Sequence, residues 1–218
     1  MTQDPAGRAT AGTTRVLIAD DQTLIRTALA TMLAIEDDLD VVAQAESCGA
    51  AVHQAASTQP DVVLLDVQMP AGGLDVDDGI DALPHLLAAA PEARVIVVTT
   101  FGRPGYLRRA LEAGAIGFLV KDTPVDRLID GIRKAAAGLR VVDPELAAAS
   151  LSIGASPLSE KEGLVLAAST GGVSTSEIAR TVHLSEGTVR NYLSSAIGKL
   201  GARNRAEALR LATENGWV

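Results

Sequence analysis

The residues best suited to chemistry in this chain are polar side chains that follow short apolar runs. Asp20 and Asp21 follow the first such run, Asp66 follows another, and two later runs end in Thr99 and Lys121. Three carboxylates, a hydroxyl and an amine at one place would suit acceptance of a phosphoryl group assisted by Mg²⁺. A single Asp after a strand is usually only a turn residue, so the prediction depends on all five occurring together.

Alternating strands and helices are expected to position these side chains. Strands are predicted over residues 15–19, 40–45, 62–65, 94–99 and 117–120. Between them, apolar residues recur three or four positions apart, which indicates amphipathic helices. The alternation predicts an α/β fold with a doubly wound, five-stranded parallel sheet. Ligands of such sheets bind beyond the carboxyl ends of the strands, where the polar residues lie.

This stretch resembles the receiver domain of two-component response regulators over residues 14–137. The matching residues are Asp20, Asp21, Asp66, Met69, Pro70, Asp78, Gly79, Thr99, Ala113, Gly114, Ala115, Phe118 and Lys121. The resemblance implies a CheY-like fold in which Asp66 is the phosphoacceptor. It also implies that Mg²⁺ is held by Asp21, Asp66 and the backbone carbonyl of Gln68, with Asp20 acting through water. Lys121 and Thr99 would then bind the phosphoryl oxygens.

The resemblance further implies a switch at Thr99 and Phe118. On phosphorylation Thr99 would move inward and the ring of Phe118 would rotate towards the interior, as a shift between two packings. A Phe at this position could equally be a plain core residue. Gln68 and Phe101 match the two positions that tune loss of the phosphoryl group in the family. Because Phe101 is apolar and cannot orient water, we expect a phosphoryl lifetime of minutes to hours.

One loop departs from the family pattern. Between Pro70 and Asp78 there are seven residues, Ala71 to Asp77, where the family usually has two. The longer loop brings Asp75 and its acidic neighbours towards the predicted metal site. We interpret them as solvated loop carboxylates, and the alternative is that they alter magnesium affinity or kinase docking.

The pattern changes after the predicted receiver. Glycine, proline and alanine in residues 138–156 predict a linker with one short helix, and residues 157–218 predict four helices and no strand. Ser159 and Glu162 are spaced as a capping box. Further helix caps are expected at Ser174 or Thr175 and at Ser185.

The last segment has the spacing of a helix-turn-helix and resembles the LuxR-type effector domain of the NarL/FixJ family. The matching residues are Leu158, Ser159, Glu162, Glu177 to Ala179, Leu184 to Val189, Lys199, Leu200, Asn204, Arg205, Glu207 and Ala208. Residues 186–199 would be the recognition helix. Arg190, Asn191 and Ser194 would face the major groove, and Thr188, Tyr192, Lys199 and Arg203 would contact phosphates. On pattern alone, a helical protein-interaction module is the alternative.

Some shorter stretches look like the DesR-type subgroup of this family, which controls a membrane-lipid desaturase. These stretches are residues 99–101, 103–106, 187–192 and 216–217. This likeness implies a membrane-bound histidine kinase as the cognate partner.

Composition and charge bound the class of protein. The 218 residues are 47% hydrophobic and 21% charged, which predicts a packed protein. The single Cys48 excludes an intrachain disulfide and fits a reducing cytosol. No apolar run approaches the length of a spanning helix, and residues 1–13 lack the apolar stretch of a signal peptide and are expected to form a flexible tail. We therefore expect a cytoplasmic protein without direct membrane insertion.

Together these patterns predict a DNA-binding transcriptional response regulator and not an enzyme. A histidine kinase would transfer a phosphoryl group to Asp66 with Mg²⁺, and the resulting homodimer would bind promoter DNA. One alternative is a phosphorylation-independent DNA-binding regulator whose receiver is a dimerisation scaffold. Another is a small metal-dependent phosphatase fused to a helical tail.

Overall fold

The computed structural model describes residues 12–100, 102–144, 146–148 and 156–218, and the chain divides into two compact units. The first unit contains a parallel sheet, and the second contains the helices from residue 160 onwards. Most of the predicted N-terminal tail, residues 1–11, lies outside the described residues. Across the described part of the chain, every helix is too short or too polar to cross a bilayer.

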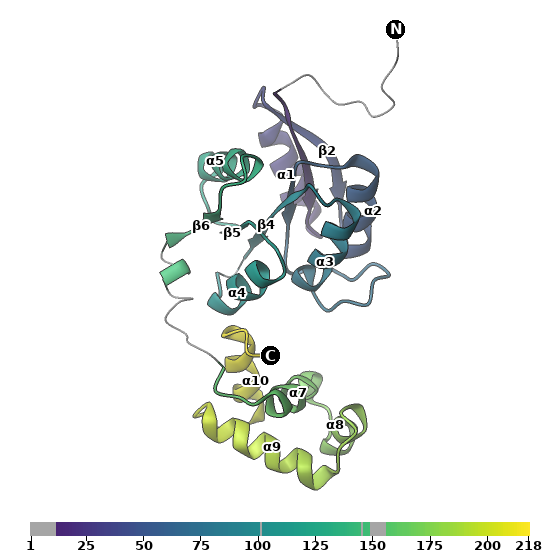
Figure 1. Ribbon diagram of the computed structural model, residues 1–218, viewed down its shortest axis with the longest axis vertical. Coiled ribbons are helices and arrows are strands. Elements are labelled where there is room, and N and C mark those ends of the chain that lie inside the picture. Colours follow the sequence, from purple (N-terminus) through teal and green to yellow (C-terminus); the bar gives the residue numbers. More distant parts are fainter. Residues whose placement is uncertain (1–11, 101, 145, 149–155) are drawn as a thin grey trace. The chain divides into compact units, whose positions relative to one another are not determined.

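The first unit is built on a sheet of parallel strands in the order β2-β1-β3-β4-β5-β6. The strands are β1 (Thr14–Ala19), β2 (Leu39–Ala45), β3 (Val62–Leu65), β4 (Arg94–Thr99), β5 (Gly117–Val120) and β6 (Val141–Val142). The helices between them are α1 (Thr23–Leu33), α2 (Cys48–Thr58), α3 (Gly79–Ala89), α4 (Pro104–Glu112) and α5 (Val125–Ala136) (Figure 1). The predicted α/β fold is confirmed.

The sixth strand corrects the prediction of five. Val141 and Val142 pair in parallel with Gly117 and Phe118 of β5, although they lie in the segment that the sequence predicts to be linker. Two residues are too few to show the alternation by which a strand is recognised in a sequence. Beyond β6, Pro144 and residues 146–148 are helical, in the part of the linker where one short helix is predicted.

Both faces of the sheet are buried. On one face Ile18, Leu64 and Ile96 pack with Leu33 of α1 and Ile132 of α5 in a single cluster. The alternate strand residues point to the other face, where α2 and α3 lie side by side (Figure 1). Burial of both faces explains why the strands are nearly continuous apolar runs.

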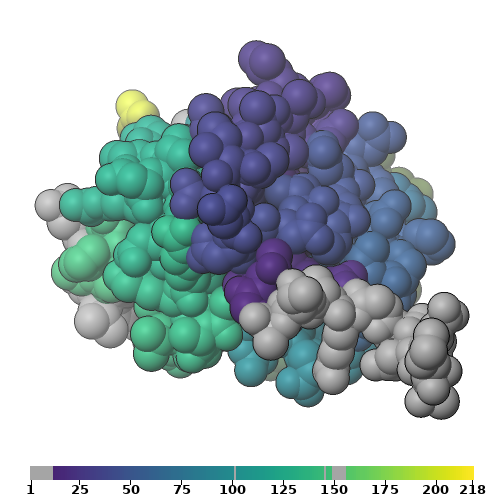
Figure 2. Space-filling view, turned by 90° about the horizontal axis from the view of Figure 1, so that it is seen from above, coloured from purple at the N-terminus to yellow at the C-terminus, as the bar shows by residue number. Residues whose placement is uncertain are grey.

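Charged contacts join α5 to the segment that follows α1. The guanidinium of Arg133 donates to both carboxylate oxygens of Asp38, at 2.8 and 2.7 Å, and to Glu36 at 2.7 Å. Figure 2 shows the green surface of the α5 region against the indigo surface of the segment after α1. Because all three side chains are partly exposed, these contacts fix the geometry of the junction more than they stabilise it.

All the regular secondary structure among the described residues of the second unit is helical. It comprises α7 (Glu160–Ala167), a short 3₁₀ turn (Thr170–Gly172), α8 (Thr175–Thr181), α9 (Glu186–Lys199) and α10 (Arg205–Glu214). Ser159, Ser174 and Ser185 each accept a hydrogen bond from the amide three residues later, which confirms the predicted caps. Helices α7, α8, α9 and α10 enclose one apolar core. The predicted all-α domain with a helix-turn-helix is confirmed.

A buried carboxylate ties α7 to α9. Glu162 is only 5% exposed, and it accepts hydrogen bonds from the Ser159 amide at 2.6 Å, the Ser195 hydroxyl at 2.7 Å and the Lys199 ammonium at 2.6 Å. The contact with Lys199, helped by the Ser159 amide and Ser195, lowers the pKa of Glu162 to about 2. The carboxylate therefore stays ionised at neutral pH and holds the end of α9 against α7.

Protonation of Glu162 is expected to weaken the second unit in acid. In the folded protein the pKa of Glu162 lies below its ordinary value of 4.5. The carboxylate therefore contributes fully to the free energy of unfolding above pH 4.5, and this contribution is lost as the pH falls towards 2. Glu162→Gln should remove this pH dependence and lower the free energy of unfolding by roughly 1–3 kcal/mol at neutral pH. Urea unfolding followed by the fluorescence of Trp217, the single tryptophan, would measure both effects.

Glu186→Gln is the matched control, because this exposed carboxylate makes only a 3.5 Å contact with Arg190. It should leave the acid dependence of unfolding unchanged. An unaltered pH dependence in Glu162→Gln would show that another group causes it.

Candidate functional site

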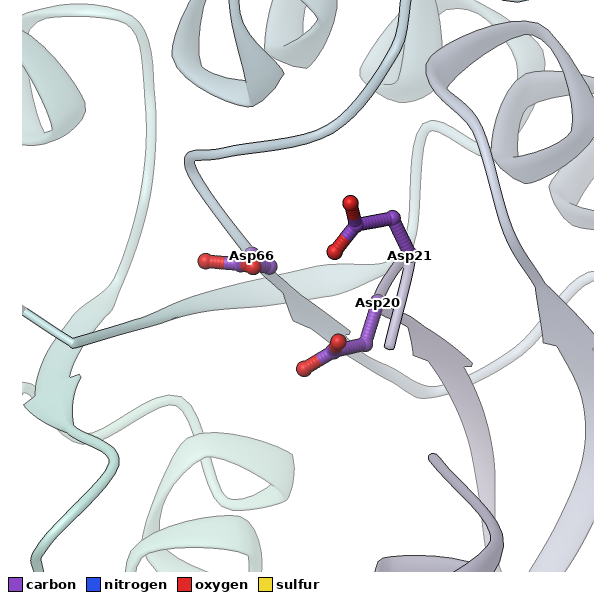
Figure 3. Close-up of side chains that lie close together, drawn as sticks. All are labelled: Asp20, Asp21 and Asp66. Atoms are coloured by element: carbon purple, nitrogen blue, oxygen red, sulfur yellow. The ribbon is translucent and has the colours of Figure 1, made fainter. Parts of the chain in front are cut away.

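The carboxyl ends of β1 and β3 bring three carboxylates together. Asp20 and Asp21 follow β1 and Asp66 follows β3, and the two strands are hydrogen-bonded neighbours. Oxygens of the three side chains lie within 4.8 Å of one another, at the ends of their strands (Figure 3). Asp20 and Asp66 are buried and Asp21 is exposed. The sheet thus assembles the predicted acidic cluster and leaves one of its acids open to solvent.

The ammonium of Lys121 lies between two of these carboxylates. It contacts Asp20 Oδ2 at 2.7 Å and Asp66 Oδ2 at 2.9 Å, and the backbone amide of Lys121 donates to the Thr99 carbonyl at 2.7 Å. Burial alone would lower the pKa of Lys121, but the hydrogen bonds to Asp20 and Asp66 outweigh burial and raise that pKa. The lysine therefore stays charged and offsets part of the negative charge of the cluster.

Asp66 is the most deeply placed of the acids, with 2% of its surface exposed. Its Oδ2 accepts from Lys121, whereas Oδ1 has no hydrogen-bond partner of good geometry among the described residues. Burial raises the pKa of the Asp66 carboxyl above its usual range, and Lys121 opposes this rise. A buried carboxylate oxygen without a partner is costly, and in native proteins such an atom calls for a functional explanation.

Backbone contacts hold the acids in place. The Gln22 amide donates to Asp20 Oδ1 at 2.8 Å, and the Arg26 guanidinium donates to the Asp20 carbonyl at 2.5 Å. A Cβ atom on Gly79, the first residue of α3, would lie only 2.0 Å from the Asp66 carbonyl oxygen. Only glycine therefore allows α3 to begin so close to Asp66. The sequence did not indicate the Arg26 contact, because an arginine that binds a backbone carbonyl leaves no pattern of paired residue types.

The two predicted switch residues lie on neighbouring strands: Thr99 is the last residue of β4, and Phe118 is the second residue of β5. Both are fully buried. The ring of Phe118 is already in the interior of this structure. The structure therefore does not contain the outward position from which the ring is expected to rotate. Gln68 is exposed in the loop after β3, and Phe101 lies outside the described residues.

The longer loop packs on the start of α2 and does not join the acidic cluster. Amides at the start of α2 donate to the carbonyls of Pro70 and Ala71 at 2.9 and 3.0 Å. Asp78 caps α3 by accepting from two amides of its first turn, and Asp75 and Asp77 are exposed. None of these three belongs to the acidic cluster found among the described residues. A cap and two solvated carboxylates agree with the simpler interpretation of the loop.

Helix α9 presents the residues predicted to face DNA. Arg190, Asn191 and Ser194 are all exposed, and their spacing places them on one side of the helix. Thr188 and Tyr192, predicted to contact phosphates, are partly buried on the same helix. The exposed side of α9 thus offers a guanidinium, an amide and a hydroxyl, which are groups that hydrogen-bond to base edges.

The two cations predicted to contact phosphates already have carboxylate partners. Lys199 is held by Glu162 at 2.6 Å. The guanidinium of Arg203 donates to both oxygens of Glu207, each at 3.0 Å. A phosphate contact by Lys199 or Arg203 would use the N–H donors that these carboxylates leave free. The sequence missed the first pair because its members are far apart in the chain.

Two sequence families match the chain. The family described as response regulator receiver domain matches residues 16–133. The family described as bacterial regulatory proteins, luxR family, matches residues 156–212. The two matches cover the parallel sheet and the helical unit in turn.

Two proteins of Bacillus subtilis are similar over nearly the whole chain. The uncharacterized transcriptional regulatory protein YvfU is 40% identical over 204 residues, which are 94% of this chain and 99% of YvfU. The transcriptional regulatory protein DesR is 38% identical over 202 residues, which are 93% of this chain and 98% of DesR.

Solved structures of RcsB are also similar. Two RcsB dimers bound to two parallel DNAs match with a TM-score of 0.66 and 25% identity, covering 93% of this chain and 98% of RcsB. RcsB from Salmonella enterica serovar Typhimurium, bound to promoter rprA with phosphomimetic BeF₃⁻, matches with a TM-score of 0.63 and 25% identity over 91% and 98% of the chains. The chain therefore belongs to the NarL/FixJ family of two-component response regulators, which are transcription regulators that join a receiver domain to a LuxR-type helix-turn-helix.

Proposed function

We propose that this regulator accepts a phosphoryl group from a histidine kinase on Asp66 and that the acyl phosphate controls its binding to promoter DNA. The observation that carries the proposal is the state of Asp66. The carboxylate is buried, Lys121 holds one of its oxygens, and the other oxygen has no hydrogen-bond partner of good geometry among the described residues. That arrangement orients a nucleophile and keeps its second oxygen available.

The side chains of the site have separate roles in the transfer. Asp66 Oδ1 attacks phosphorus, and the bond between phosphorus and the histidine nitrogen of the kinase breaks. Lys121 stays charged and pairs with an oxygen of the bound phosphoryl group. The hydroxyl of Thr99, at the end of β4, donates to another oxygen of that group.

The acidic cluster fits Mg²⁺, because all its donors are oxygens. Asp20 already accepts hydrogen bonds from Gln22 and Lys121, which supports an indirect role for Asp20 through water. Asp21, Asp66 and the backbone carbonyl of Gln68 would hold the ion. When bound, Mg²⁺ supplies positive charge that offsets the repulsion between the carboxylates and the phosphoryl group.

The phosphoryl group would act on the rest of the receiver through Thr99 and Lys121. Thr99 ends β4 and Lys121 follows β5, the two strands pair with each other, and the buried Phe118 lies on β5. We interpret the switch as a shift between two packings of this region, biased by the new contacts to the phosphoryl group.

The helical unit supplies DNA binding. Arg190, Asn191 and Ser194 would read base edges in the major groove, where Arg pairs with guanine and Asn with adenine. Thr188, Tyr192, Lys199 and Arg203 would contact phosphates and set the register of the helix. Binding as a homodimer would place two recognition helices on two half-sites, in keeping with the RcsB dimers seen on DNA.

The proposed partners follow from this scheme. They are promoter DNA, a second copy of the chain when phosphorylated, and a cognate histidine kinase. The resemblance of residues 99–101, 103–106, 187–192 and 216–217 to the DesR-type subgroup implies that this kinase is membrane-bound. The regulator itself would act in the cytoplasm without inserting into the membrane. We place the domain limits at residues 14–137 for the receiver, 138–156 for the linker and 157–218 for the DNA-binding domain, with residues 1–13 as a tail.

Asp66→Ala should abolish phosphorylation. Acetyl phosphate with Mg²⁺ should add one phosphoryl group to the wild-type protein, detected by intact-mass spectrometry, and none to the variant. Phosphorylation should raise the affinity of the wild type for an operator duplex roughly tenfold, a typical coupling between two sites. Asp75→Ala removes an exposed loop carboxylate and is the control that should behave as wild type.

Beryllofluoride with Mg²⁺ distinguishes the main alternative. If the receiver were only a dimerisation scaffold, the reagent would change neither the oligomeric state nor the affinity for DNA. A wild-type protein that gained no phosphoryl group in the mass spectrum would refute the proposal itself.

Arg190→Ala and Asn191→Ala should each weaken binding to an operator selected from a random library. The loss should be about 1–3 kcal/mol for the selected duplex, because a bidentate contact with one base is removed. Affinity for a scrambled duplex should change much less, and fluorescence anisotropy would measure both. Arg210→Ala, which removes the same charge from α10, is the matched control. Equal losses on both duplexes would assign Arg190 and Asn191 to the phosphates.

A further inference from the structure

A single buried valine fastens the start of the linker to the receiver. Val141 is 8% exposed, whereas Leu139, two residues earlier, is 57% exposed. The Val141 amide donates to the Ile116 carbonyl at 3.1 Å, and its side chain belongs to the apolar cluster between the sheet and α5. The chain after α5 thus returns to the sheet at Val141.

Two glycines make room for this valine. A Cβ atom on Gly117 of β5 would lie 3.1 Å from the Cβ of Val141, and one on Gly131 of α5 would lie 3.0 Å from its Cγ1. Glycine destabilises the interior of a helix and of a strand. The space that Val141 occupies explains Gly131, and it explains Gly117 together with Ile96, whose Cγ1 would also lie 3.1 Å from a Cβ at that position. We call Gly117, Gly131 and Val141 the glycine socket.

The strand that forms the socket also leads to the phosphoacceptor site. Gly117 and Phe118 of β5 pair with Val141 and Val142. At its other end β5 leads directly into Lys121, whose ammonium contacts Asp66. A displacement of β5 at the acidic site would therefore shift β6 as well, because the two strands share backbone hydrogen bonds.

Strand β6 has little backbone pairing with the sheet. The strand has two residues and lies at the edge of the sheet, so it pairs on one side only. A cavity of about 430 Å³, lined by β5, α5 and β6, opens beside it. The glycine socket and the pairing of β6 are among the contacts that keep this segment on the receiver, together with the Leu139 amide, which donates to the Lys134 carbonyl at 2.9 Å.

We propose that β6 is a releasable strand, and that binding of a phosphoryl group to Asp66 unseats Val141 and frees the linker. This inference rests on the proposed function. The phosphoryl group draws on Lys121 and Thr99 at the ends of β5 and β4, and the two-residue edge strand is the first pairing to give way. Release of residues 139–143 adds five residues to the tether, up to roughly 17 Å when extended. The longer tether lets paired DNA-binding domains reach both half-sites.

Hydrogen–deuterium exchange of the Val141 amide in the full-length protein tests the proposal. Beryllofluoride with Mg²⁺ should speed exchange of this amide at least tenfold in the wild type. Without the reagent, Val141→Ala and Gly131→Ala should each produce a similar increase, because one empties the socket and the other fills it. Leu139→Ala is the control and should exchange as wild type.

The double variant distinguishes loss of the glycine socket from a general destabilisation of the receiver. In Gly131→Ala with Val141→Ala, the added methyl occupies the space left by the removed one, so exchange of the residue 141 amide should return towards the wild-type rate. Alanine also favours the helix more than glycine, so weakening of α5 cannot explain the effect of Gly131→Ala. Single variants that exchange no faster than Leu139→Ala, or a double variant that exchanges as fast as either single one, would overturn the socket.

The same exchange experiment distinguishes release of β6 from binding of the phosphoryl analogue at Asp66. If beryllofluoride slowed exchange at Thr99 and Lys121 but left Val141 unchanged, the release would be refuted and the proposed function would stand. If the reagent altered none of these amides and acetyl phosphate added no mass, both would fail. Faster exchange at Val141 together with protection at Lys121 is the result that supports release.

Discussion

The structure depends most on one buried arrangement of charge, the Lys121 ammonium between the carboxylates of Asp20 and Asp66. Charges removed from water are costly unless they are paired, and the pairing requires three chain segments to meet at one edge of the sheet. The strand order brings this about, because β1 lies beside β3 and only β4 separates β3 from β5. Lys121 donates to one carboxylate oxygen of Asp66 and leaves the other available. The contact that stabilises the buried charge thus also leaves one Asp66 oxygen able to accept a further contact.

The two units use buried carboxylates for opposite purposes. Glu162 accepts three hydrogen bonds, and these lower its pKa to about 2. Asp66 has a single cationic partner and an oxygen without a partner of good geometry, and burial raises its pKa. The fully satisfied acid holds α9 in place, whereas the incompletely satisfied acid is the one on which the proposed phosphoryl transfer depends.

The sequence alone determined the class of the fold, the caps and the identity of the acidic cluster. Apolar runs buried on both faces leave a clear strand pattern, and Ser159, Ser174 and Ser185 act on amides three residues away. These features are local, so residue type and spacing are enough to reveal them. The residues of the acidic cluster could be named because each directly follows a strand, and parallel strands present their carboxyl ends at one edge.

Only the tertiary structure decided which of these residues touch and what surrounds them. The Lys199–Glu162 pair, the Arg26 contact and the approach of Gly79 to Asp66 join residues distant in the chain or involve backbone atoms, so no spacing shows them. The sixth strand was missed because Val141-Val142 is too short for a pattern and gains its structure from Gly117 and Gly131. The chain encodes its elements locally, but pairing and burial arise only when those elements are packed together.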